Sequence, residues 1–209
     1  LAKAIFKVDP DKFRIISNDV GGSFGMKGAA FVEPISVLYA ARKLGRPVKW
    51  TADRSESFVA DHQGRDSVIT AELALDAEGH FLGLRCRGVG NVGAYLTAMG
   101  PAPMTNVICR NIISVYKTPA FSYNTQAVFS NTVPTGPYRG AGRPESKYIM
   151  EQLVDRAARE MGIDRVEIRR KNLIPKDAFP WKAPNGQTYD SGEFEEIMDA
   201  ALERADWNG

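Results

Sequence analysis

The sequence predicts an α+β fold with a mixed sheet, and three observations support that class. A strand-like run, a glycine-rich turn, a helix-like run and a second strand-like run follow one another over residues 13–51. Residues 66–95 alternate apolar and polar side chains on either side of a turn signal, which is typical of a long β-hairpin. Residues 144–162 place apolar side chains at helical spacing. With 209 residues, of which 44% are hydrophobic, the chain can bury a sizeable core.

The first of these units is predicted to be of the βαβ type. Residues 13–16 form its first expected strand, and residues 20–27 supply the glycine-rich turn. Residues 29–44 carry apolar side chains at helical spacing and stop at Gly45, so they predict a packed helix. Residues 47–51 are the second expected strand.

The middle of the chain is predicted to contain the hairpin, a loop and a further strand. Residues 76–79 are the hairpin turn. Residues 97–114 show little pattern and contain two prolines, which predicts a loop over the sheet, and residues 123–130 predict another strand. The next thirteen residues, 131–143, hold three glycines and two prolines. Loops of this length inside a compact domain are usually functional or disordered.

Three helices are expected in the last third of the chain. Pro144 suits the first turn of a helix that stops at Gly162. Asp164 with Glu167, and Asp190 with Glu193, are capping-box patterns that predict two shorter helices. We therefore expect residues 1–209 to form one domain, with 164–209 as a helical C-terminal extension. Because the chain begins with Leu rather than Met and enters a strand-like run early, we expect it to be a fragment of a longer polypeptide.

Composition argues against a membrane protein and against a metal bound by the chain itself. No apolar run approaches the roughly 18 residues that span a bilayer, and no signal segment opens the chain, which favours a cytoplasmic location. Cys86 and Cys109 fit no metal or redox spacing, so we expect two reduced, partly buried thiols. His62 and His80 have no neighbouring ligand cluster, and each is expected to be a surface or hydrogen-bonded histidine.

The net charge of +2 does not indicate nucleic-acid binding. The main basic cluster has no aromatic residues interleaved with it, so a solvated helix face explains it better than a nucleic-acid patch. Its members are Arg165, Arg169, Arg170 and Lys171.

Two glycine loops, residues 20–27 and 136–145, favour a ligand-binding function. Each places flexible backbone between a strand-like and a helix-like run, which can bring several N–H donors to an anionic ligand. The first loop has neither the phosphate-binding nor the dinucleotide-binding glycine spacing, and the alternative is a tight turn with Phe24 packed in the core. In the second loop, the permanent charge of Arg139 near a helix N-terminus suits a phosphate, pyrophosphate or oxo-metal group. Its alternative is an Arg139–carboxylate pair that pins the loop.

Five sequence blocks resemble, in the same order, the large molybdopterin-binding subunits of the xanthine dehydrogenase, aldehyde oxidase and aerobic carbon monoxide dehydrogenase family. The resemblance is nearest to the carbon-monoxide-dehydrogenase-like large subunits, and it implies a molybdenum cofactor-binding domain fold. The blocks are VGGSFGMK (20–27), GRPVKW with DRSE (45–56), GNVGAY (90–95), GPYRGAGRPE (136–145) and EIRRKN (167–172).

The resemblance implies that both loops bind the cofactor and face one shared cavity. The first loop matches a segment whose backbone, chiefly the Phe24 amide, faces the molybdenum oxygen ligands. Arg139 matches an arginine whose main-chain amide also contacts the cofactor. The cofactor-binding residues implied are Gly22, Ser23, Phe24, Gly25, Arg139 and Gly140.

The resemblance also implies a substrate pocket that differs from those of purine and carbon monoxide oxidisers. Gly28 stands where purine-oxidising members carry a glutamate, Val107 where they carry an arginine, and Ala141 where they carry a stacking phenylalanine. Gly140 stands where the copper-containing carbon monoxide dehydrogenases carry a copper-binding cysteine. The expected substrate of the intact enzyme is a small aldehyde, N-heteroaromatic or acyl-thioester compound.

In this family a molybdenum hydroxide attacks the substrate carbon, hydride passes to a sulfido ligand, and electrons leave through iron–sulfur clusters to flavin. The chain has neither the cysteines for such clusters nor a flavin motif. The resemblance therefore implies an iron–sulfur subunit, an FAD subunit and the remainder of the large subunit as partners. It implies molybdopterin, in the cytosine dinucleotide form, as the cofactor.

The family's catalytic glutamate and its upstream glutamine at the metal match no position here. We therefore expect the isolated chain to be inactive and to hold no cofactor. Two alternatives remain: a non-catalytic assembly domain that keeps the fold without the cofactor, and a small nucleotide-binding protein, against which the missing nucleotide spacings count.

Overall fold

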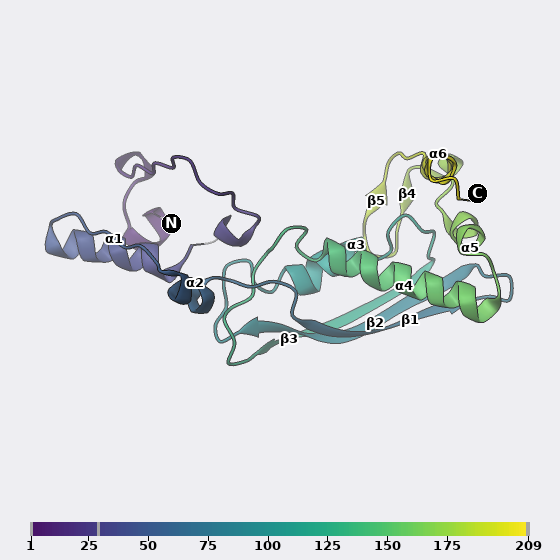
Figure 1. The fold of residues 1–209 in the computed structure, drawn as a ribbon, viewed down its shortest axis with the longest axis horizontal. Coiled ribbons are helices and arrows are strands. Elements are labelled where there is room, and N and C mark those ends of the chain that lie inside the picture. The colour runs from purple at the N-terminus through teal and green to yellow at the C-terminus, as the bar shows by residue number, and fades with distance from the viewer. Residues whose placement is uncertain (1, 29, 208–209) are drawn as a thin grey trace.

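The computed structural model describes residues 2–28 and 30–207, and it has two lobes (Figure 1). The N-terminal lobe, residues 2–61, lies beside a larger lobe that is built on a sheet (Figure 1). No described side chain in residues 3–61 is buried, so the hydrophobic core belongs to the larger lobe.

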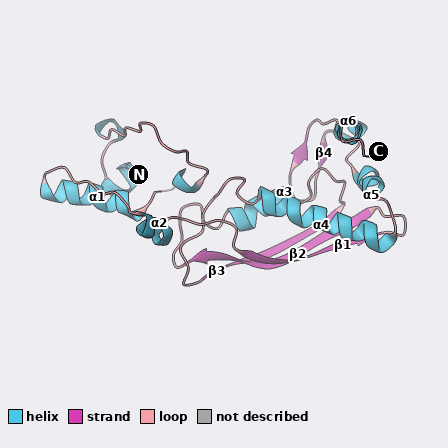
Figure 2. Cartoon of the chain, viewed as in Figure 1, coloured by secondary structure: helices cyan, strands magenta, loops and turns pink. Residues whose placement is uncertain are grey.

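The N-terminal lobe consists of helices and loops (Figure 2). Its main helices are α1 (Val32–Leu44) and α2 (Arg54–Ala60), and single helical turns form at Ala2–Phe6, Pro10–Lys12 and Met26–Gly28. The expected strands at 13–16 and 47–51 are wrong, because in the described chain neither segment pairs with another strand. Ile15 and Ile16 are exposed there instead. Strand-like side chains do not form a strand without a partner and a face to bury.

The sheet of the larger lobe is mixed, as predicted. It contains β1 (Ser67–Leu75), β2 (Phe81–Gly93) and β3 (Ala120–Phe129), in the order β1-β2-β3. β1 and β2 form the expected antiparallel hairpin, and β3 pairs parallel to β2. A parallel pair requires a crossover connection, which here runs through residues 94–119.

The crossover is part of the core and not a loop over the sheet. Residues 103–107 form a π-helical turn and Ile108–Asn111 forms α3. Ile108, Ile112 and Ile113 are fully buried. The prediction for 97–114 was wrong because the prolines and the glycine were weighed above the apolar residues Met104, Ile108 and Ile112, which recur every fourth residue as in a helix.

The helix α4 (Arg143–Met161) covers one face of the sheet (Figure 1). It begins with Pro144 in its first turn and ends at the left-handed Gly162, as predicted. Met150 and Val154 of α4 are fully buried in the same cluster as Leu84 of β2. This packing fixes the second glycine loop, which leads directly into α4.

Residues 164–207 add two helices and a small sheet. These elements are α5 (Arg165–Asn172), a helical turn at Lys176–Ala178, β4 (Trp181–Lys182), β5 (Thr188–Tyr189) and α6 (Phe194–Arg204). The Asp164 cap is confirmed, since its carboxylate accepts hydrogen bonds from the N–H groups of Val166 and Glu167. The Asp190 cap is wrong: α6 begins after Glu193, without a side-chain cap. Across the described ranges, no helix is long and apolar enough to cross a membrane.

The basic cluster on α5 is a solvated face only in part: Arg165 and Lys171 are exposed, as predicted, whereas Arg169 and Arg170 join α5 to other helices. Arg169 donates to Glu151 at 2.8 Å and to Asp155 at 2.8 Å, both on α4. Arg170 donates to Glu195 and Asp199 on α6. The partner carboxylates lie on other helices, where spacing within the cluster cannot reveal them.

Candidate functional site

The two glycine loops touch through their main chains. The N–H of Arg139 donates to the carbonyl of Phe24 at 2.8 Å, and the Arg139 guanidinium lies 5.9 Å from the centroid of the Phe24 ring. A Cβ atom added to Gly25 would lie 2.8 Å from the carbonyl oxygen of Pro137. Only a glycine allows this approach, so the first loop is shaped to fit the second.

Both loops contain clustered left-handed residues. Alternating and successive positive φ angles turn peptide N–H groups toward one side, which forms the concave arrangement that binds anions in many proteins. Such conformations are costly for residues other than glycine and gather at ligand sites. The residues and φ angles are Gly22 (92°), Phe24 (50°) and Gly25 (93°) in the first loop, and Gly140 (99°), Ala141 (45°) and Gly142 (94°) in the second.

The first loop presents N–H donors that have no acceptor within the described chain. The N–H groups of Gly22, Ser23 and Phe24 donate no hydrogen bond to any described residue, whereas the carbonyl of Ser23 accepts from Met26. The N–H of Arg139, by contrast, is already bonded to Phe24. The first loop thus offers three adjacent donors to an anionic ligand, and the N–H of Gly140 in the second loop has no acceptor in the described chain either.

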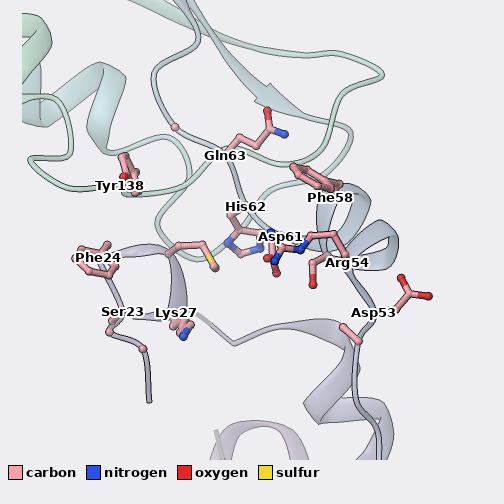
Figure 3. A pocket seen from close by; sticks show the side chains of 16 residues that line it. Ser23, Phe24, Lys27, Asp53, Arg54, Phe58, Asp61, His62, Gln63 and Tyr138 are labelled. Carbon is pink, nitrogen blue, oxygen red and sulfur yellow. The ribbon is translucent and has the colours of Figure 1, made fainter. Parts of the chain in front are cut away.

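A cavity of about 740 Å³ opens beside the first loop. Figure 3 shows Ser23, Phe24 and Lys27 on one side of it and Arg54, Phe58 and Asp61 on the other. The volume lies in the range of small-molecule and cofactor sites. Tyr138 of the second loop also lines the cavity, so both loops contribute to its wall.

Helix α2 supplies much of this wall, although the sequence did not predict it. The carboxylate of Asp53 caps α2 by accepting from the N–H of Glu56 at 2.7 Å. The Asp53–Glu56 spacing was a signal that could have located this helix. Its side chains Arg54, Ser57 and Phe58 line the cavity.

His62 is a buried histidine at the cavity, which contradicts the expected surface or hydrogen-bonded role. Its side chain is stacked on Phe31 with 4.3 Å between ring centroids, and Nδ1 is buried without a hydrogen-bond partner in the described structure. Burial lowers the pKa of His62 below its ordinary value of 6.5, while Asp61 and Glu33 oppose this shift. His62 is therefore held neutral. His80, in contrast, has the predicted hydrogen bond, to Asp76 at 3.0 Å.

The segment after His62 joins the cavity wall to the second loop. The N–H of Gln63 donates to Pro134, and the carbonyl of Gln63 accepts from the N–H of Gly136 at 2.7 Å. These bonds form a short parallel bridge between Gln63 and Thr135. The second loop is thus attached to the segment that carries His62.

The residues expected near a substrate lie around the loops but not in the cavity wall. Gly28 ends the helical turn that follows the first loop, and space around it is open. Val107 lies beside the second loop, where a Cβ on Gly142 would come within 3.2 Å of the Val107 Cβ. The N–H of Ala141 donates to Tyr138. A Cβ on Gly140 would lie 2.6 Å from the ring of Pro144, so a side chain there requires the helix start to move.

The GNVGAY block has a structural role that its sequence did not indicate. Asn91 donates to Asp66 and Thr132, while its Oδ1 accepts from the N–H of Gly93 and from Ser130. These bonds join the end of β2 to the residue before β1 and to the segment after β3 that leads to the second loop. Asn91 therefore fixes where that loop leaves the sheet.

The thiols and the other candidate ligands do not form a metal site in the described ranges. No group of three or more His, Cys, Asp or Glu residues with suitable geometry occurs there. Cys86 and Cys109 are free thiols, as predicted, and burial raises the pKa of Cys86 to about 12. The alternative Arg139–carboxylate pair is also absent from the ion pairs of this part of the chain.

Residues 1–173 match the family model described as the molybdopterin cofactor-binding domain. The chain is 37% identical over 195 residues to the 6-hydroxypseudooxynicotine dehydrogenase complex subunit gamma of Paenarthrobacter nicotinovorans, covering 91% of this chain and 24% of that protein.

Two solved structures are similar along most of the chain. Quinoline 2-oxidoreductase from Pseudomonas putida 86 superposes with a TM-score of 0.84 at 35% identity, over 91% of this chain and 24% of that one. Carbon monoxide dehydrogenase from Oligotropha carboxidovorans superposes with a TM-score of 0.89 at 29% identity, over 99% of this chain and 26% of that one. The chain thus spans about a quarter of the length of these relatives.

Proposed function

Because the chain belongs to the molybdopterin cofactor-binding domain family, we propose that its two glycine loops hold the molybdenum cofactor of a molybdenum hydroxylase. The observation that carries this proposal is the contact between Phe24 and Arg139 beside a cavity of about 740 Å³. When bound, the cofactor supplies the redox and hydroxylation chemistry. The chain supplies hydrogen-bond donors to the cofactor and a cavity that positions it.

The residues present fit such a cofactor. The oxygen-rich groups of a pterin cofactor accept hydrogen bonds, and the N–H groups of Gly22, Ser23 and Phe24 have no acceptor in the described chain. Lys27 and Arg54 can pair with a phosphate ester in the same cavity, whose wall also holds the carboxylates of Asp53, the cap of α2, and Asp61. We propose the cytosine dinucleotide form of molybdopterin, and we assign its contacts to Gly22, Ser23, Phe24, Gly25, Arg139 and Gly140.

We propose that the intact enzyme oxidises a small aldehyde, N-heteroaromatic or acyl-thioester substrate. The similarity to quinoline 2-oxidoreductase favours an N-heteroaromatic within that group. Gly28, Val107 and Ala141 carry no carboxylate, guanidinium or aromatic ring at the positions expected near the substrate. Purine recognition would lack its polar and stacking contacts there.

We further propose that the chain acts inside a larger assembly. It spans 24% of the first relative, a complex subunit, so the rest of the large subunit would complete the site. An iron–sulfur subunit and an FAD subunit would remove electrons. In this arrangement residues 1–209 form part of the cofactor-binding domain, with 164–209 as its helical C-terminal extension, in a cytoplasmic enzyme.

Metal and nucleotide analysis of the full-length protein tests the proposal. The protein should be purified from cells that make the cofactor, and its molybdenum and released nucleotides should be measured per large subunit. We expect close to one molybdenum and one cytidine monophosphate for each subunit. A folded, partner-bound protein without molybdenum would instead support the non-catalytic assembly domain.

A further inference from the structure

We propose that Arg65 is a positioning residue that sets the direction of the Gly140 N–H in the second glycine loop. Its effect on catalysis rests on the proposed function, whereas its effect on the loop does not. The guanidinium of Arg65 donates to the carbonyl of Arg139 and lies 5.1 Å from the centroid of the Tyr138 ring. Its Nε atom is 3.7 Å from Oε1 of Glu145, in the first turn of α4. One side chain thus contacts two adjacent loop residues and the helix that follows them.

The geometry of a peptide bond carries the effect of Arg65 to Gly140. The peptide unit is planar and trans, so the N–H of Gly140 points opposite to the carbonyl of Arg139. Because Arg65 binds that carbonyl, it also fixes the direction of that N–H. Within the described chain the Gly140 N–H donates to no residue, which leaves it available to a ligand. The other end of Arg139 is held by its hydrogen bond to Phe24.

The backbone around Arg65 is itself fixed on both sides. On one side, Gln63 exchanges hydrogen bonds with Pro134 and Gly136. On the other, the carbonyl of Asp66 accepts from the N–H of Asn91 at 2.9 Å. Between them Arg65 has a left-handed φ of 62°, which is unfavourable for a residue with a side chain. Arg65 is therefore a rigid support, and the loop is the part that it orders.

An arginine suits this position better than a lysine. The planar guanidinium can stack on Tyr138 while it donates to the carbonyl of Arg139 and forms an ion pair with Glu145. The ammonium of a lysine can donate to the carbonyl but cannot make all three contacts with one geometry. The Arg65→Lys variant should therefore rescue only part of the function.

Hydrogen exchange in the full-length protein tests this role without relying on the cofactor. Peptides that cover residues 136–142 contain three hydrogen-bonded amides, those of Gly136, Arg139 and Ala141. In Arg65→Met we expect these amides to exchange about tenfold faster, because a charge-assisted bond is lost. Arg65→Lys should lie between that variant and the unaltered protein. The matched control is Arg87→Met, which removes an exposed arginine that lies 3.8 Å from Glu72 on the sheet.

The same variants separate this inference from the proposed function. Exchange rates in Arg65→Met equal to those in Arg87→Met would overturn the inference, whatever the metal content. If Arg65→Met does not fold, Arg65→Lys decides by the same comparison. Where the unaltered protein carries molybdenum, we expect turnover per bound molybdenum to fall about tenfold in Arg65→Met, with partial rescue in Arg65→Lys and no change in Arg87→Met. Absence of molybdenum in the unaltered protein would count against the proposed function alone.

Discussion

The main-chain hydrogen bond from Arg139 to Phe24 joins two loops that are far apart in the sequence. It is reinforced by the approach of Gly25 to the carbonyl of Pro137 and by the Arg139 guanidinium over the Phe24 ring. The wall of the cavity therefore depends on how well these two loops fit.

The first prediction concerns Gly25→Ala. The added methyl group would meet the Pro137 carbonyl at 2.8 Å and would force the loops apart. We expect a loss of about 2–3 kcal/mol in the free energy of unfolding, from the left-handed backbone and the clash together. In the full-length protein, molybdenum content should fall as well. The control is Gly186→Ala, which has a similar φ of 82° but open space around it. Equal losses of stability in the two variants would show that the loop contact contributes nothing.

The second prediction concerns the backbone of Ala141. Its φ of 45° is left-handed, so Ala141→Gly should stabilise the fold by roughly 0.5–1 kcal/mol once the entropy of glycine is included. Chemical denaturation would measure this gain. Ala127→Gly in β3 should destabilise the protein, because no positive φ is relieved there. A loss of stability in Ala141→Gly would mean that the backbone conformation carries no strain.

The third prediction concerns the substrates of the intact enzyme. Xanthine and carbon monoxide should be turned over poorly, and an aldehyde or N-heteroaromatic compound better, in assays with an artificial electron acceptor. The positions expected to contact a purine lack polar or stacking groups, and losing such contacts costs a few kcal/mol in recognition. Efficient oxidation of xanthine or carbon monoxide would contradict the interpretation of these positions.

Gly140→Cys should not by itself create carbon monoxide oxidation. Copper needs a shaped surrounding as well as a thiolate. The structure adds a steric reason, since a Cβ at Gly140 would lie 2.6 Å from Pro144 at a φ of 99°. We expect this variant to be destabilised and to show no gain of carbon monoxide turnover. A stable variant with normal unfolding would show that the start of α4 adapts easily.

The fourth prediction concerns pH. Burial lowers the pKa of His62 in the folded state below its ordinary value of 6.5. As the pH falls below 6.5, the unfolded chain therefore binds a proton at His62 before the folded chain does. The contribution of His62 to stability is therefore complete above pH 6.5 and is lost as the pH falls below it. His62→Phe keeps the ring stacked on Phe31 and should remove this dependence between pH 7 and 5.

His80→Gln is the matched control for the pH experiment, because His80 is the second of the two histidines and is exposed. Between pH 7 and 5, the free energy of unfolding of His80→Gln should change with pH as it does in the unaltered protein. If His62→Phe still loses as much stability at pH 5 as the unaltered protein, another group is responsible for that loss.

The fifth prediction concerns the link between α4 and α5. Arg169→Met removes hydrogen bonds to Glu151 and Asp155 at a partly buried site, and should lower the free energy of unfolding by about 2–3 kcal/mol. Arg156→Met removes an exposed pair with Glu160 on one helix and should have no measurable effect. Similar results for the two arginines would restore the idea of a solvated basic face.

Local patterns in the sequence predicted those elements whose stability is decided locally. The hairpin of β1 and β2, the helix α4 with its proline and glycine ends, and the Asp164 cap all follow from spacing within a few residues. The family blocks located the two glycine loops. What they could not give is the contact between the loops, since it depends on Gly25 meeting Pro137.

The wrong predictions have a common physical cause. Residues 13–16 have strand-like side chains but no partner strand in the described chain, and Arg169 and Arg170 of α5 pair with carboxylates on α4 and α6. The role of Arg65 was not predicted, because it depends on an unusual φ and on partners in distant segments. In each case the outcome is set by neighbours in space, which one sequence does not reveal.

The N-terminal lobe contributes a wall of the cavity without burying any described side chain in residues 3–61. Its attachment to the sheet lobe therefore rests on partly buried contacts, such as Phe31 on His62, and not on a shared buried core. A ligand that binds only when both loops are together adds its binding free energy to that attachment, by an amount that grows with its concentration relative to its dissociation constant. Binding of a ligand in the cavity and attachment of the N-terminal lobe are thus thermodynamically linked, so the bound ligand also stabilises the contact between the two lobes.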